Sequence, residues 1–125
     1  MEYVEKHITW KMMPKETVTL MPIGDAQVGA DASDLKRLRT HVDWGFHTKH
    51  ALFLGMGDYV DMASPSNRRI LKAAGLYDTV TEALQAKAKE DIKTFLESTL
   101  YTKGAWLGLL QGHHYMDMAD GTTSD

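Results

Sequence analysis

The sequence contains no cysteine among its 125 residues. This absence excludes disulfide bonds and the cysteine-ligated zinc and iron–sulfur sites. Any metal ion must therefore be held by histidine nitrogens and by carboxylate or amide oxygens. Residues 1–10 lack the apolar core of a secretory signal peptide, and no apolar run is long enough to span a bilayer. We therefore expect a cytoplasmic protein that has no contact with a membrane.

The chain also lacks a strong excess of charge of either sign. It has 14 basic and 17 acidic residues, which give a formal net charge of −3. A bulk electrostatic attraction to nucleic acid is therefore absent. Hydrophobic residues make up 43% of the sequence, so the chain is long enough for one domain with a core and too short for two.

Three short apolar or β-branched runs predict central strands, and two stripes at helical spacing predict helices between them. The strands are expected at residues 17–24, 51–55 and 105–111, and the helices from Asp31 or Ser33 to about residue 50 and from Thr79 to about residue 100. Strand, helix and strand within about forty residues indicate a βαβ unit with parallel strands. Residues 1–15 resemble a peripheral strand, and 64–75 and the region near Tyr115 resemble further helices. The expected fold is α/β, with a mainly parallel sheet flanked by helices.

The same pattern follows each of the three predicted central strands. Each run ends in glycine and then presents side chains that can bind metal ions or carry protons. These side chains are Asp25 and Gln27 after the first strand, Asp58 and Asp61 after the second, and His113 and His114 after the third. Because ligands of open α/β sheets bind at the carboxyl ends of the strands, we expect a metal site there.

The ordered set Asp-x-Gln at 25–27, Gly-Asp-x-x-Asp at 57–61 and Gly-His-His at 112–114 resembles the calcineurin-like metallophosphoesterase superfamily. The strand-tip signature of that family is D-x-H, then G-D-x-x-D, then G-N-H followed by an acid. The resemblance covers about residues 17–118 and implies an αββα sandwich, of which this sheet would form a part. In the family, further histidines follow downstream. Residues 1–125 are therefore expected to be a single domain that is shortened at its C-terminal end.

The resemblance implies a role for each residue at the strand ends. Two divalent ions, manganese first and otherwise iron, zinc or magnesium, would be bound, and a metal-bound hydroxide would attack the phosphorus of a phosphomonoester or phosphodiester. The implied metal ligands are Asp25, Gln27, Asp58 as the bridging carboxylate, and His113. His114 would protonate the leaving oxygen, and Asp61 would orient the imidazole of His114.

Three departures from the family pattern support an alternative function. Gln27 replaces the commoner histidine, His113 replaces asparagine, and Tyr115 replaces an acid. The alternative is a catalytically impaired calcineurin-like scaffold that serves partner binding or assembly. Taken singly, each aspartate could also be an ordinary turn or capping residue. A phosphate-binding domain without hydrolysis would place a glycine-rich loop where this chain has Asp25 and Gln27.

Substrate recognition is less specified by the sequence. Arg68 and Arg69 follow the Gly-Asp-x-x-Asp motif and are candidates to bind substrate phosphate, although exposed arginines at a helix start need no such role. Tyr59 is a candidate for stacking on a base or for packing in the core. The substrate class remains open between a nucleotide, a nucleic acid and a phosphoprotein. An exposed sheet edge can pair with another chain, so the sequence also leaves the formation of an oligomer open.

Overall fold

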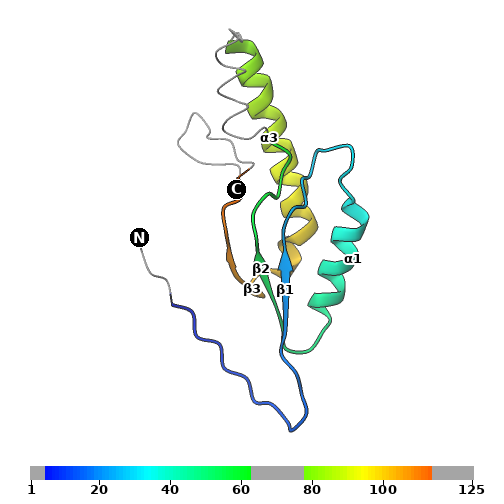
Figure 1. The fold of residues 1–125 in the computed structure, drawn as a ribbon, viewed down its shortest axis with the longest axis vertical. Helices are drawn as coiled ribbons and strands as arrows, with labels where there is room; N and C mark the ends of the chain where they lie inside the picture. Colours follow the sequence, from blue (N-terminus) through cyan, green and yellow to red (C-terminus); the bar gives the residue numbers. More distant parts are fainter. Residues whose placement is uncertain (1–4, 63–77, 114–125) are drawn as a thin grey trace.

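The computed structural model describes residues 5–62 and 78–113 (Figure 1). Its elements follow one another as strand, helix, strand, helix, a short 3-10 turn and strand. They are β1 (Thr19–Ile23), α1 (Leu35–Phe46), β2 (Ala51–Gly55), α3 (Asp78–Thr99), η1 (Leu100–Thr102) and β3 (Trp106–Leu109). The three central strands and the two helices between them are therefore confirmed, with ends that differ by a few residues. The helices expected at 64–75 and near Tyr115 lie outside the described residues.

The three strands form one parallel sheet in the order β1-β2-β3. Leu20 pairs with Leu52 and Pro22 with Leu54 along β1 and β2. The β2–β3 register shifts by one residue after Phe53. An α/β fold with a parallel sheet is confirmed, and all three carboxyl ends lie at one edge of the sheet.

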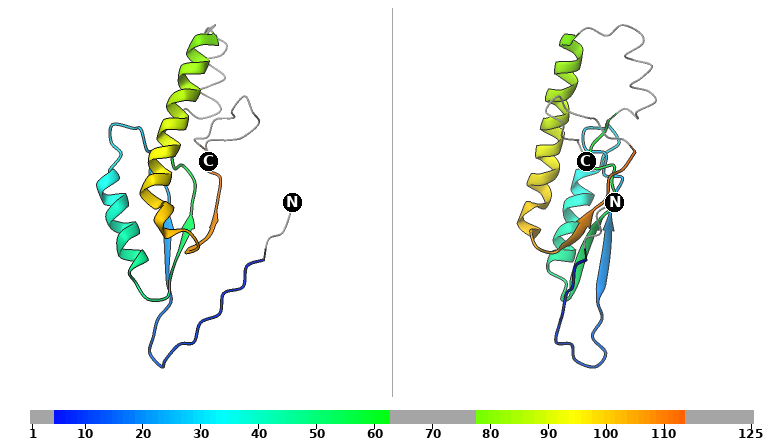
Figure 2. Two further views of the ribbon diagram at one scale, coloured as in Figure 1. Left: turned by 180° about the vertical axis from the view of Figure 1, so that it is seen from behind. Right: turned by 90° about the vertical axis from the view of Figure 1, so that its left-hand side faces the viewer.

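Helices α1 and α3 lie on the same side of the sheet (Figure 2). Beneath α1, the buried core residues Ile23, Val42 and Phe53 form one cluster. Phe53 is fully buried and stacks on Trp106 of β3 with ring centroids 5.0 Å apart. Since Trp106 packs against the core under both helices, this ring joins the two halves of the interior.

A second core cluster ties the long helix α3 to the segments that follow β1 and β2. Phe95 and Ala88 of α3 are buried together with Val28 and Val60. Tyr59 belongs to the same cluster, with 3% of its surface exposed and its ring 5.0 Å from that of Phe95. Tyr59 is therefore a packing residue, and α3 fixes the backbone beyond the strand ends by burial of apolar surface.

The start of α1 differs by one to three residues from the expected cap. The N-cap is Asp34, whose Oδ1 accepts a hydrogen bond from the backbone amide of Arg37 at 2.9 Å. Ser33 instead donates its hydroxyl to the carbonyl of Ala26 at 2.8 Å. The turn before the helix thus places Asp34, rather than Asp31 or Ser33, where a carboxylate satisfies an open amide.

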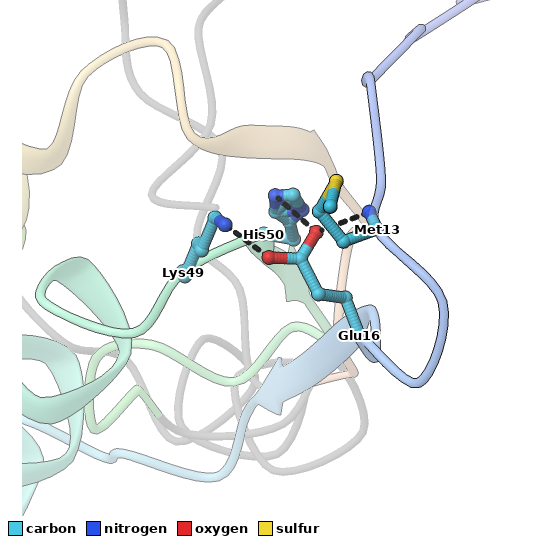
Figure 3. A network of polar contacts seen from close by, with 4 residues as sticks. All are labelled: Met13, Glu16, Lys49 and His50. Atoms are coloured by element: carbon cyan, nitrogen blue, oxygen red, sulfur yellow. Dashed lines mark hydrogen bonds and ion pairs between the residues drawn. The ribbon is translucent and has the colours of Figure 1, made fainter.

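The N-terminal segment is not a strand in its described part, residues 5–15, which makes no ladder pairing. It is held by side chains instead (Figure 3). Glu16 accepts hydrogen bonds from Lys49 and from the backbone amide of Met13, and lies 3.9 Å from the buried ring of His50. These polar contacts replace the ladder that was expected from the alternating pattern.

Within the described ranges, no helix has the length and apolar character needed to cross a membrane.

Candidate functional site

The backbone beyond β1 and β2 continues as two joined segments that carry the candidate residues. The amide of Asp25 donates to the carbonyl of Gly57 at 3.2 Å, and the amide of Gln27 donates to the carbonyl of Asp58 at 3.1 Å. Val28 and Val60 then form an isolated parallel bridge. The first two motifs of the sequence therefore lie side by side, held by main-chain hydrogen bonds.

The segment after β3 joins the same edge through Asp58. The carboxylate of Asp58 accepts a hydrogen bond from the backbone amide of His113 at 2.8 Å. Its other oxygen lies 2.9 Å from the ring Nδ1 of His113. The hydroxyl of Tyr59 also donates to the carbonyl of Leu110 at 2.9 Å. All three strand ends are thus connected, with Asp58 in the middle.

Three of the four candidate metal ligands have a left-handed backbone. The φ angles of Asp25, Gln27 and Asp58 are 52°, 40° and 54°. In the described residues, only Lys15 and His50 share a positive φ among residues other than glycine. Such conformations cost about 1–3 kcal/mol each and concentrate where function requires a fixed side-chain direction. The strain at this edge therefore marks it as the candidate site.

Two glycines permit the close approach of the second and third strand ends. A Cβ at Gly57, where φ is 88°, would lie 2.4 Å from the backbone nitrogen of Gly112. A Cβ at Gly112 would lie 2.1 Å from the carboxylate of Asp58. Any side chain at either position would push His113 away from Asp58, which explains the glycines that precede Asp58 and His113 in the sequence.

The structure places the four predicted ligands in two separate contacting pairs. The side-chain amide of Gln27 donates to Oδ1 of Asp25 at 2.7 Å, and Asp58 contacts His113 as described. The side chain of Asp58 is 15% exposed and that of His113 is 73% exposed. Across the described residues, no group of three or more histidine, aspartate or glutamate side chains is placed to hold a metal ion. The pairs are linked through the backbone of Gln27 and Asp58.

The chemistry of the donors fits divalent transition metals. Carboxylate oxygens, an amide oxygen and an imidazole nitrogen are the ligands that manganese, iron and zinc accept. Two ligand atoms of one octahedral ion lie about 3 Å apart, which is close to the 2.7 and 2.9 Å separations within the two pairs. The side-chain amide nitrogen of Gln27 points toward Asp25. A rotation of the amide group by 180° would exchange its nitrogen and oxygen and present the oxygen as a metal ligand.

The remaining predicted residues are placed only in part. Asp61 is exposed, and its amide donates to the carbonyl of Val28 at 2.9 Å, which fixes its backbone at the end of the joined segments. His114, Arg68 and Arg69 lie outside the described residues.

A pocket that the sequence did not indicate opens beside Asp25 and Gln27. Its volume is about 390 Å³, and it lies between the segment 24–34 and one face of α1. Arg37 and His41 of α1 line it. Their spacing of four residues, which places two side chains on one helix face, is the signal that could have identified them.

Comparison of the chain with protein-family models, curated proteins and solved structures gave no match.

Proposed function

We propose that this chain is a metal-dependent phosphoesterase of the calcineurin-like metallophosphoesterase superfamily. It would act in the cytoplasm on a phosphomonoester or phosphodiester and use two divalent ions, with manganese as the first choice. One observation carries the proposal. Asp25, Gln27, Asp58 and His113 form two contacting pairs at one edge of a parallel sheet, in the strand order of the family signature.

The position of Asp58 supports a bridging role for its carboxylate. Its carboxylate contacts His113, and its backbone carbonyl, which accepts from the backbone amide of Gln27, links it to the other pair. At 15% exposure its charge is poorly screened by water, which strengthens its attraction for cations. Bound divalent ions would supply Lewis-acid polarisation of the phosphoryl oxygens and would lower the pKa of an attacking water. Asp25 and Gln27 would complete the ligand set on the β1 side.

His114 is the proposed general acid and Asp61 its orienting carboxylate. His114 follows His113 directly in the chain, and His113 is held at Asp58 by its backbone amide. The backbone of Asp61 is fixed by Val28 across the joined segments. A carboxylate that accepts a hydrogen bond from an imidazole N–H keeps the ring in one orientation, which is what proton transfer to a leaving oxygen requires.

The second face of the sheet supports the sandwich that the family would form. Leu20, Leu52 and Leu54 alternate with the residues that face the helices, and Leu20 is 54% exposed. No described helix covers this face (Figure 2). Parallel sheets are normally covered on both faces, and strands buried on both faces are apolar on both sides. We propose that the second layer of an αββα sandwich packs on these leucines.

Calorimetric titration with manganese tests the metal site directly. The wild-type chain should bind manganese with micromolar affinity, and Asp58→Asn should abolish this binding. Asp43→Asn, which makes the same change in charge at an exposed position of α1, should bind as the wild type does. Hydrolysis of bis(p-nitrophenyl) phosphate on the same samples tests turnover.

The outcomes separate the enzyme from the alternative scaffold. Manganese binding that depends on Asp58, with turnover, would support the phosphoesterase. A folded wild-type chain that binds no manganese would contradict the proposal and support a catalytically impaired scaffold for partner binding or assembly.

A further inference from the structure

The pocket beside Asp25 and Gln27 has the dimensions of a small-molecule site. Its volume of about 390 Å³ falls in the range of roughly 300–1,000 Å³ that is usual for such sites. Small side chains at Ala26, Ala30 and Ala32 leave this space open. Since Asp25 and Gln27 belong both to the pocket wall and to the proposed metal site, a molecule in the pocket would reach the metal site with one end.

Arg37 of α1 lines the pocket together with the carboxylates of Asp25 and Asp34. Arg37 lies in the first turn of α1 and is 74% exposed on its side chain. Its Nε lies 3.5 Å from Oδ2 of Asp34, which orients the guanidinium. The two Nη groups make no hydrogen bond to any residue in the ranges 5–62 and 78–113, so four N–H donors face solvent or a ligand.

A guanidinium with open N–H donors is the side-chain group best suited to bind a phosphate or carboxylate through two parallel hydrogen bonds. His41 follows Arg37 at a spacing of four residues, so the two side chains form the α1 wall of the pocket. A phosphoryl group bound at Asp25 and Gln27 would leave the rest of its molecule along this wall. The wall therefore favours a second anionic group on that part of the molecule.

We propose that the substrate is a small organic phosphate ester that carries a second anionic group, and that Arg37 binds this group. This inference rests on the proposed function. It favours small molecules over nucleic acids and phosphoproteins, because the pocket volume matches a small ligand, and a polymer would need a long groove. Arg37 would be a specificity-determining residue that takes no part in proton transfer.

Adenosine 3′,5′-bisphosphate and adenosine 5′-monophosphate test the proposal as a matched pair of probes. Calorimetry in the presence of manganese should give about tenfold tighter binding of the bisphosphate to the wild-type chain. Arg37→Met should remove this preference and leave manganese binding unchanged. Lys36→Met is the control. It removes a positive charge from the position next to Arg37, and the side chain of Lys36 does not line the pocket.

The result that would overturn the inference is distinct from failure of the proposed function. A chain that binds manganese but shows no preference for the bisphosphate would contradict the role of Arg37 and leave the proposed function standing. Equal losses in Arg37→Met and Lys36→Met would do the same, since they would reflect only overall charge. A chain that binds no manganese would overturn the proposed function, and the inference with it. Circular dichroism melting curves confirm that both variants are folded.

Discussion

Asp58 meets both the backbone and the side chain of His113, with a hydrogen bond of 2.8 Å from the amide and a contact of 2.9 Å to the ring Nδ1. The two residues are 55 positions apart in the sequence. Asp58 is nearly buried and His113 is largely exposed. The contact closes the gap between the ends of β2 and β3, so one aspartate serves both as a structural link and as a candidate ligand.

His113→Ala removes the ring and keeps the backbone hydrogen bond to Asp58. Under the proposed function, manganese affinity should fall by about tenfold or more, because the imidazole of a proposed ligand is lost. Thermal stability should change little, since the ring is 73% exposed. Calorimetry and thermal melting measure the two effects. His47→Ala is the control, because that ring makes a similar exposed contact with Asp43. Unchanged manganese affinity in His113→Ala would exclude His113 as a ligand.

Gly57→Ala should destabilise the fold and weaken metal binding together. The positive φ alone costs about 1–2 kcal/mol, which Gly104→Ala measures separately, because Gly104 has a φ of 94° and no heavy atom within 4 Å of an added Cβ. The clash with Gly112 should add about 1–3 kcal/mol. Urea unfolding of both variants gives the difference. Equal losses in the two variants would contradict the close approach of the β2 and β3 ends.

Glu16→Gln should reduce stability in a manner that depends on pH. The hydrogen bond from Lys49, followed by that from Met13, lowers the pKa of Glu16 below its ordinary value of 4.5 (Figure 3). Because the folded pKa lies below the unfolded one, the stabilisation is complete above the unfolded pKa and is lost as pH falls through the folded pKa.

Melting temperatures of the wild type and Glu16→Gln, recorded from about pH 7 to about pH 3, should therefore converge below pH 4.5. Glu97→Gln provides the comparison, since Glu97 is 62% exposed and its contact with Lys93 is 3.7 Å long. That variant should follow the wild type at every pH. A gap between wild type and Glu16→Gln that stays constant with pH would contradict the assigned cause.

Phe53→Ala should cost about 3–5 kcal/mol of unfolding free energy. The side chain is fully buried between the sheet and α1, and its ring stacks on Trp106. Phe46→Ala removes the same atoms from a position that is 46% exposed, and should cost much less. Chemical denaturation of the pair tests the assignment. Similar losses at both positions would place the core elsewhere.

The central strands were predictable from the sequence because each is a short apolar run that ends in glycine. The same holds for the stripe of α3, where Ala88 and Phe95 are buried as their spacing requires. The N-terminal segment was not predictable in this way. Its alternating pattern resembles a strand, but strand formation needs a partner edge, and Glu16 with Lys49 holds the segment by side chains.

The candidate site was predictable in its residues and not in its geometry. The order of Asp25, Gln27, Asp58 and His113 at the strand ends could be read directly, because parallel strands share one edge for their carboxyl ends. The division of these residues into two contacting pairs could be seen only from the backbone angles and hydrogen bonds of the folded chain. The pocket lined by Arg37 could not be predicted in the same way. Its shape depends on the distance between α1 and the segment after β1, which no local sequence pattern encodes.

Local chemistry therefore determined the three central strands, the two helices between them and the residue types that stand at the strand ends. Those features depend on hydrophobic periodicity and on glycine, which act over a few neighbouring residues. The tertiary structure alone decided that Asp58 reaches His113 and that Arg37 and Asp25 line the same pocket. Contacts between distant residues depend on how whole elements pack, and packing is a property of the complete core.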